Sequence, residues 1–146
     1  MNPSDTRLSL TRGYHFAAVH FYHDRSLSPA ENERLFGKCS DKRGHGHDYR
    51  LEVTLCGPVQ ERTGMLLDLR EMDRIVEAAV LRHVEHRNLN LQVGYFASHQ
   101  PTCENLALWA WLQLQGRFPG CRLVRVRVHE SDDLGADCQA AVPESG

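Results

Sequence analysis

Hydrophobic and polar residues alternate in two stretches of the chain, and each stretch predicts a β-strand that is half buried. In residues 47–56 (HDYRLEVTLC) every second residue is apolar, and in residues 121–130 (CRLVRVRVHE) valines alternate with arginines and a histidine. Successive side chains of a strand point to opposite faces, so both patterns predict one apolar and one polar face. The aromatic-rich run 13–23 (GYHFAAVHFYH) predicts a strand buried on both faces, and the run 65–69 (MLLDL) is a further candidate strand.

Capping residues and apolar spacing predict two helices in the first two thirds of the chain. The segment 28–36 (SPAENERLF) carries a serine cap, a proline at the first helical position and a glutamate three residues after the cap. This capping box predicts a short helix that ends at Gly37. Asp68 caps a second helix, in which apolar residues recur at helical spacing over residues 69–84. The following segment, 86–101, is predicted to be irregular.

A third helix is predicted from Thr102, its capping residue, to about Gln115, before Gly116. Its central segment, LALWAWLQL, is apolar almost all round. A helix of this kind is buried on every side, so we expect part of it to lie at a subunit interface.

The order of these elements indicates an α+β fold with a small antiparallel sheet of four strands. Such a sheet has open edges, which proteins protect by closing a barrel or by forming oligomers. The length of 146 residues predicts one domain, residues 1–146, with loose termini at 1–12 and 140–146.

Composition excludes several classes of protein. The formal net charge is −2 and the pI is about 6.5, so no strong positive field suits the chain to nucleic acid or to an anionic membrane surface. No apolar run approaches the ~20 residues of a membrane span, and the first residues lack the apolar core of a signal peptide. We therefore expect a cytoplasmic location. The five cysteines include no Cys-x-x-Cys pair, which argues against a disulfide framework and against a cysteine-type structural zinc site.

Histidine is abundant, with 9 residues, and two of them form a His-x-His pair. His45 and His47 would share one face of a strand, with Cα atoms roughly 6.5–7 Å apart, so both can bind one metal ion. His20, near the end of the first predicted strand, is the best placed third ligand. Three histidines and one vacant position are typical of catalytic zinc. The alternative is a pair of solvated strand histidines.

Further polar residues are candidates for chemistry. Cys39 precedes the pair in a polar loop, where a thiol near metal-binding histidines can act as a base or a nucleophile; a structural loop cysteine is the alternative. Cys103 begins a helix, a position that can lower the pKa of a thiol, but it is expected to be structural, like the three other cysteines outside this loop. Glu130 continues the apolar row of its strand, so it is predicted either to face a ligand with paired N–H donors or to lie in solvent past the strand end. Glu85 can orient the ring of His86 for chemistry. The alternative is that His86 is a histidine at a helix C-terminus, where it interacts favourably with the helix dipole.

Six sequence blocks resemble those of the 6-pyruvoyl-tetrahydropterin synthases and their relatives, the 6-carboxy-tetrahydropterin synthases. The blocks, in order along residues 13–133, are FAAVHFYH, LFGKCSDKRGHGHDY, TGMLLDL, EHRNLN, PTCEN and VRVHESD. The Cys-x5-His-Gly-His spacing within the second block is specific to this resemblance.

The resemblance implies roles for individual residues. His20, His45 and His47 match the zinc ligands, Cys39 matches the catalytic thiol, and His86 matches the histidine that works with it. Glu130 matches the glutamate that anchors the pterin ring and assists catalysis. Glu85 replaces the aspartate that precedes this histidine in the family, and Cys103 replaces a common threonine or serine. The neighbouring Thr102 and Glu104 are the remaining substrate-binding candidates.

The resemblance also implies an assembly and a reaction. The tunnelling fold has two long helices on one face of an antiparallel sheet; three subunits close a barrel, two trimers stack into a hexamer, and active sites lie between subunits. The substrate of the family is 7,8-dihydroneopterin triphosphate. Zinc would bind its side-chain hydroxyls as a Lewis acid while Cys39 removes a proton, and triphosphate leaves without any nicotinamide. The candidates for triphosphate binding are Arg25, Lys38, Lys42 and Arg43.

Two other functions stay open. A 6-carboxy-tetrahydropterin synthase of queuosine (deazaguanine) synthesis would use the same substrate. A catalytically silent, zinc-binding family member would act as an assembly or regulatory subunit, although the retained Cys39 and His86 argue against this.

Overall fold

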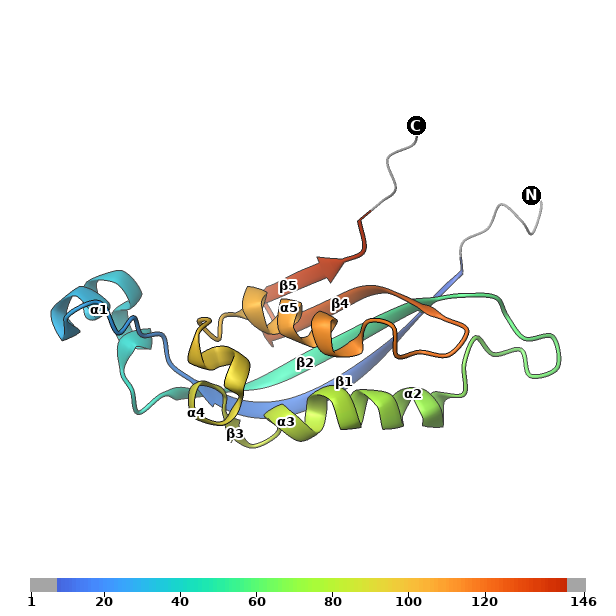
Figure 1. Ribbon diagram of the computed structural model, residues 1–146, viewed down its shortest axis with the longest axis horizontal. Helices are drawn as coiled ribbons and strands as arrows, with labels where there is room; N and C mark the ends of the chain where they lie inside the picture. Colours follow the sequence, from blue (N-terminus) through green and yellow to red (C-terminus); the bar gives the residue numbers. More distant parts are fainter. Residues whose placement is uncertain (1–7, 142–146) are drawn as a thin grey trace.

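A computed structural model describes residues 8–141, which form an α+β fold with helices packed on one face of a five-stranded sheet (Figure 1). The strands are β1 (Ser9–His20), β2 (His45–Cys56), β3 (Arg87–Asn88), β4 (Arg122–Ser131) and β5 (Leu134–Gln139). Their order in the sheet is β3-β1-β2-β4-β5, and β3 is parallel to β1 while the other pairs are antiparallel. The sheet is therefore mixed and open, and the prediction of four antiparallel strands is wrong.

The helices follow the predicted caps closely. They are α1 (Pro29–Phe36), α2 (Leu69–Val76), α3 (Arg82–Val84), α4 (Leu89–Gln92) and α5 (Cys103–Leu114), with 3-10 turns at Gly37–Ser40 and Gly94–Ala97 and a π-helical turn at Glu77–Leu81. Both halves of the predicted capping box are present at α1, and Thr102 accepts a hydrogen bond at the start of α5. The π-helical turn joins α2 to α3, so the predicted helix over 69–84 has the right extent. Among residues 8–141, no helix combines the length and apolar character needed to cross a membrane.

Three predictions about strands are corrected by the structure. The first strand begins at Ser9 and ends at His20, and only its core-facing residues near the end are buried, so it is not buried on both faces. The run 65–69 forms no strand; Leu66 and Leu67 are buried in the turn before α2, and Leu69 is the exposed first residue of that helix. The predicted loose leader overlaps β1 from Ser9 onward. Residues 1–7 and 142–146, the rest of the predicted loose termini, lie outside the described residues.

The core lies between the sheet and helices α2 and α5. Tyr49, Leu51 and Val53 of β2 are fully buried, as their alternation predicts. They belong to the same hydrophobic cluster as Met72 of α2 and Leu106 of α5. The helices thus cover the face of β2 that carries its odd-numbered residues.

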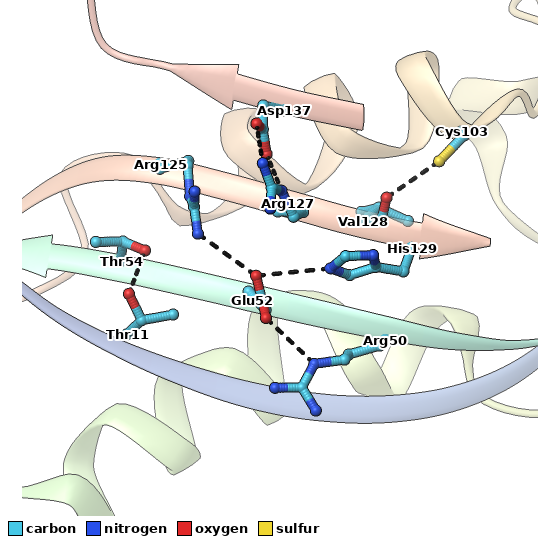
Figure 2. A network of polar contacts seen from close by, with 10 residues as sticks. All are labelled: Thr11, Arg50, Glu52, Thr54, Cys103, Arg125, Arg127, Val128, His129 and Asp137. Carbon is cyan, nitrogen blue, oxygen red and sulfur yellow. Dashed lines mark hydrogen bonds and ion pairs between the residues drawn. The ribbon is translucent and has the colours of Figure 1, made fainter. Parts of the chain in front are cut away.

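The opposite face of the sheet carries a polar network instead of helices (Figure 2). Arg50 Nε lies 3.2 Å from Glu52 Oε1, and Arg125 Nη2 lies 3.4 Å from Glu52 Oε2. His129 Nε2 lies 3.6 Å from the same oxygen, Oε2. We call Arg50, Glu52, Arg125 and His129 the Glu52 network. It lies on the open face because side chains alternate along β2 and β4.

Helix α5 is buried on one side only within this chain. Leu106 and Leu114 are buried against the sheet, but Leu108 and Leu112 are 40% and 44% exposed. The single chain therefore leaves Leu108 and Leu112 exposed on the outer surface of α5, and their burial at a subunit interface stays a prediction.

Candidate metal centre and neighbouring groups

Four potential metal ligands converge on the core face, at the end of the sheet where β1 ends and β2 begins. They are His20, His45, His47 and Glu130, which we call the His/Glu cluster; one ligand atom from each lies within 4.8 Å of the others. His20 Nε2 is 2.9 Å from His45 Nε2. Glu130 Oε1 is 2.9 Å from His47 Nε2 and 3.6 Å from His20 Nε2.

Strand pairing explains why residues so far apart in sequence meet here. In the antiparallel pair β1–β2, His20 lies directly opposite His45. Side-chain alternation then directs His47 to the same face as His45, as predicted from the His-x-His pattern. Gly44 permits this turn into β2: its φ is +78°, and an added Cβ would lie 2.6 Å from Val19 Cγ1.

Glu130 reaches the cluster from β4, which pairs with the other side of β2. The strand continues to Ser131, and Glu130 is only 9% exposed. Of the two predicted positions for Glu130, the inward one is therefore confirmed. Within the described residues no hydrogen bond reaches its carboxylate, so the charge lies among the histidine rings without a conventional donor.

Burial favours the neutral form of His20 and of His45. His20 is completely buried, and this desolvation, followed by the neighbouring His45 and His47, lowers its pKa to about 3. The pKa of His45 is also lowered, chiefly by burial. A neutral imidazole presents a nitrogen lone pair, which is the form that binds a metal ion.

The donor atoms fit a metal ion better than they fit one another. His47 Nε2 is buried and has no hydrogen-bond partner among the described residues, because its 2.9 Å approach to Glu130 Oε1 lacks hydrogen-bond geometry. Buried polar atoms are rarely left without partners. Three imidazole nitrogens and one carboxylate oxygen that converge in this way are a donor set able to hold a metal ion.

Tyr49 supports the cluster from beneath, and sequence analysis did not single it out. Its hydroxyl lies 2.8 Å from His20 Nδ1, the ring nitrogen that does not face the cluster. The pKa of Tyr49 is raised by burial first and then by the charge of Glu130, so the phenol stays neutral. Its position two residues after His47, on the same strand face, was a signal that could have identified it.

Cys39 lies beside the cluster. Its 3-10 turn is tied to the end of β1, because the Cys39 carbonyl accepts a hydrogen bond of 2.7 Å from the Tyr22 amide. The Tyr22 ring lies 5.0 Å from the His20 ring, measured between centroids. The pKa of Tyr22 is raised by burial, then by the charges of Glu130 and Cys39. Tyr22 therefore links the turn of Cys39, which is half buried, to the ring of His20.

The Thr102 hydroxyl and the Cys103 thiol, at the start of α5, are already engaged in hydrogen bonds within the chain. The Thr102 hydroxyl accepts from the Asn105 amide at 3.2 Å, so it acts as the helix cap, and Glu104 is exposed in the first turn. Cys103 Sγ donates to the Val128 carbonyl at 3.1 Å. Burial, with the charge of Glu130, raises the pKa of Cys103 to about 11. Desolvation therefore outweighs the helix N-terminus, and Cys103 has the structural surroundings expected for it.

Glu85 and His86 lie across β1 from the cluster. Their side chains pair at 3.0 Å, and both are tied to Ala17, whose amide donates to Glu85 Oε2 at 3.0 Å and whose carbonyl accepts from the His86 amide at 2.7 Å. The His86 side chain is 79% exposed. A cavity of about 500 Å³ is lined by both His86 and His47. The cavity is also lined by Ala17, Val19, Gly46 and Asp48, which alternate to the face of the sheet away from His20 and His45, and no described contact joins His86 to the cluster.

Comparisons with known proteins agree on one family. A family model described as 6-pyruvoyl tetrahydropterin synthase matches residues 9–141. The 6-pyruvoyl tetrahydrobiopterin synthase of Drosophila melanogaster is 42% identical over 124 residues, which cover 84% of this chain and 73% of that protein. The human protein of the same name is 38% identical over 124 residues, which cover 85% of this chain and 86% of that protein.

The chain is also similar to one solved structure of the same family and to a relative with a different name. The structure of Caenorhabditis elegans 6-pyruvoyl tetrahydropterin synthase matches with a TM-score of 0.84 and 31% identity, over 93% of this chain and 97% of that one. A protein of Archaeoglobus fulgidus named putative 6-carboxy-5,6,7,8-tetrahydropterin synthase is 36% identical over 112 residues, 77% of this chain and 88% of that protein.

Proposed function

Because the chain belongs to the 6-pyruvoyl tetrahydropterin synthase family, we propose that it converts 7,8-dihydroneopterin triphosphate to 6-pyruvoyl-tetrahydropterin and releases triphosphate. Membership makes it an enzyme of pterin synthesis, a lyase. The observation that carries the specific proposal is the convergence of His20, His45, His47 and Glu130 beside Cys39.

The metal in this proposal is Zn²⁺, held by His20, His45 and His47. Imidazole nitrogens are common zinc ligands, and three of them leave a coordination position for substrate. When bound, zinc would supply Lewis-acid polarisation of the substrate hydroxyls. Glu130 anchors the pterin ring, since a carboxylate can accept two N–H donors side by side. Thr102 and Glu104, at the start of α5, are proposed as further substrate contacts.

Cys39 is the base that removes the proton from the substrate side chain. Its place beside the His/Glu cluster, not within it, supports a role in proton transfer separate from metal binding. Glu85 holds His86 at 3.0 Å, and this imidazole is proposed to exchange protons with the thiol. Because His86 is exposed and lies across β1, the proposed pair is completed by His86 of a neighbouring subunit.

We propose the tunnelling fold and a hexamer of two trimers for the assembly, with a mass of about 100 kDa for six chains of 16.6 kDa. The open sheet, with β3 and β5 at its edges, and the exposed leucines of α5 support association. Light scattering at micromolar concentration tests this, and a monomer would contradict it. The cytoplasmic location and the single domain over residues 1–146 stay predictions.

A second candidate is 6-carboxy-tetrahydropterin synthase activity in queuosine synthesis. The observation that favours it is the 36% identity to the Archaeoglobus fulgidus relative of that name. Both activities would start from the same substrate and use the same metal ligands. They differ in product, because only the carboxy product is accompanied by acetaldehyde.

The test is incubation of zinc-loaded protein with 7,8-dihydroneopterin triphosphate, followed by mass spectrometry of the pterin and assay of acetaldehyde. The 6-pyruvoyl product with triphosphate and without acetaldehyde would support the proposal. The carboxy product with acetaldehyde would establish the second candidate. Metal binding without any turnover would contradict both and favour a catalytically silent assembly subunit.

A further inference from the structure

A second cavity, of about 490 Å³, lies between the segment that follows β1 and the segment that joins α4 to α5. Its floor is apolar and includes Phe21 and Phe96, which are both buried. Its rim is polar and includes His23, Arg25 and Lys42. The cavity is separate from the opening shared by His47 and His86.

The net charge of this rim is positive, because the two cations Arg25 and Lys42 outnumber the one carboxylate, Asp24. Arg25 and Lys42 are exposed and form no ion pair or side-chain hydrogen bond with the residues described, 8–141. The carboxylate of Asp24 also lines the cavity, but it accepts two hydrogen bonds from Ser26, at 2.8 and 2.7 Å. Two free cations around a concave surface with donors nearby are suited to an anion of several charges.

The structure distinguishes between the four cationic side chains that were candidates for triphosphate binding. Arg43 is bound to Asp41, with Arg43 Nε 3.0 Å from Asp41 Oδ2, so its charge is already paired. Lys38 does not line the cavity. Arg25 and Lys42, which come from different loops, are the two that face it.

The cavity is also close to the proposed metal centre. His23 follows His20 by three residues, and Lys42 precedes His45 by three residues. Three residues of extended chain span at most about 10 Å, so both walls begin within that distance of a metal ligand.

Hydrogen bonds hold the two walls together. The His23 amide donates to Gln100 Oε1 at 3.1 Å, and Gln100 Nε2 donates to the His23 carbonyl at 2.7 Å. Asn90 forms the same kind of paired contact with the Phe21 backbone, at 2.9 and 2.8 Å. The rim is therefore positioned before any ligand arrives, which lowers the entropic cost of binding.

We propose that this cavity binds the polyphosphate chain of the substrate, and then the released triphosphate, through Arg25 and Lys42. The guanidinium of Arg25 suits bidentate contact with one phosphate, and the ammonium of Lys42 acts as a point charge on another. The identity of the substrate rests on the proposed function, whereas the affinity of the cavity for a polyphosphate anion does not.

The first experiment titrates inorganic triphosphate into the metal-loaded protein by calorimetry. We compare the wild type with the double variant Arg25→Gln/Lys42→Gln and with the matched control Lys38→Gln/Arg43→Gln, which removes the same charge from the same region. The double variant should bind about 10- to 150-fold more weakly, the usual worth of hydrogen bonds to charged groups, and the control should bind as wild type does. Metal content is measured after each titration, since triphosphate also binds metal ions.

Two results would overturn the proposal. One is that wild-type protein does not bind triphosphate; the other is that the double variant and the control lose affinity equally, which indicates only a general charge effect. Because both residues are exposed, the substitutions should leave the fold intact.

The second experiment separates this proposal from the proposed function. If 7,8-dihydroneopterin triphosphate is turned over, Arg25→Gln/Lys42→Gln should raise KM with little change in kcat. Binding of 7,8-dihydroneopterin, which lacks phosphate, should be the same in both proteins. An unchanged KM would overturn the role in substrate binding. Absence of turnover in the wild type would contradict the proposed function while the triphosphate titration still decides the anion site.

Discussion

The two faces of the sheet carry clusters of similar residues with opposite properties. The His/Glu cluster on the core face and the Glu52 network on the open face each contain a glutamate and at least one histidine, and β2 and β4 contribute to both. Glu52 is surrounded by two arginines, so its charge is offset within the chain (Figure 2). Glu130 has imidazole rings beside it and, among the described residues, no arginine, and Nε2 of His47 has no hydrogen-bond partner there.

This difference separates a structural network from a binding site. Burial by itself raises the pKa of Glu52, but hydrogen bonds and charges from Arg50 and His129 outweigh it, and the pKa is lowered. On the core face burial lowers the pKa values of His20 and His45 instead, so these two imidazoles add no positive charge beside Glu130. A divalent cation bound at the His/Glu cluster would supply positive charge beside Glu130, as the arginines already do beside Glu52.

The largest effect expected is loss of metal from His45→Ala. Removal of one of three imidazoles leaves too few ligands for tight binding, so metal analysis should find most of the zinc absent. The matched control is His129→Ala, which removes an imidazole from the open face and should retain its metal. Full retention of zinc in His45→Ala would contradict the assignment of the site.

Cys39→Ala should reduce turnover by about 10²- to 10⁴-fold, the usual contribution of a general base. Metal content and substrate affinity should stay nearly unchanged, because the thiol lies beside the cluster and is not among its ligand atoms. Single-turnover kinetics measure the effect, with Cys56→Ala as the control. Wild-type turnover, or loss of zinc, would show that the thiol is not the base.

Glu130→Ala should weaken substrate binding as well as turnover. Loss of a charged partner from buried N–H donors costs about 2–5 kcal/mol, which isothermal titration can measure. Glu130→Gln keeps one acceptor oxygen and should have an intermediate affinity. Because Glu130 Oε1 lies 2.9 Å from His47 Nε2, zinc is measured in the same samples. Unchanged substrate affinity in Glu130→Ala would exclude the pterin contact.

Tyr49→Phe should lower metal affinity by about 10- to 100-fold, since a partner on the second ring nitrogen orients a ligand histidine and fixes its tautomer. Competition with a chromogenic chelator measures this. Tyr14→Phe is the control, because it removes a hydroxyl that bonds Asp73 at 2.9 Å far from the cluster. Equal affinities in the two variants would mean that the Tyr49 hydroxyl does not position His20.

The smallest effect is expected on the open face. The lowered pKa of Glu52 means that its carboxylate stabilises the fold above the ordinary value of 4.5, and that this contribution disappears as pH falls through the folded-state pKa. Glu52→Gln should lose about 1 kcal/mol or less of unfolding free energy at neutral pH, and should match wild type in strong acid. Urea denaturation at both pH values checks this. Loss of zinc would contradict the separation of the two faces.

Short sequence patterns, such as helix caps and strand alternation, correctly predicted the helices and strands that are stabilised by residues close together in the chain. The caps at Ser28 and Thr102 and the alternation of β2 were correct because neighbouring residues supply the hydrogen bonds and the apolar face. Strand β5 was missed because its apolar row is short and made of small side chains: Ala136 and Cys138 pack against the core but are only partly buried, and backbone pairing with β4 holds this edge strand in place. The run 65–69 is apolar, yet it packs as a turn.

The sequence by itself determined which residues can bind a metal and that His45 and His47 share one face, since alternation is a property of any strand. Only the tertiary structure decided that His20 lies opposite His45 and that Glu130 turns inward beside them. It also decided that Cys103 is an inert, buried thiol. The physical reason is that burial and long-range strand pairing set the electrostatics of a side chain, and neither is encoded in its immediate neighbours.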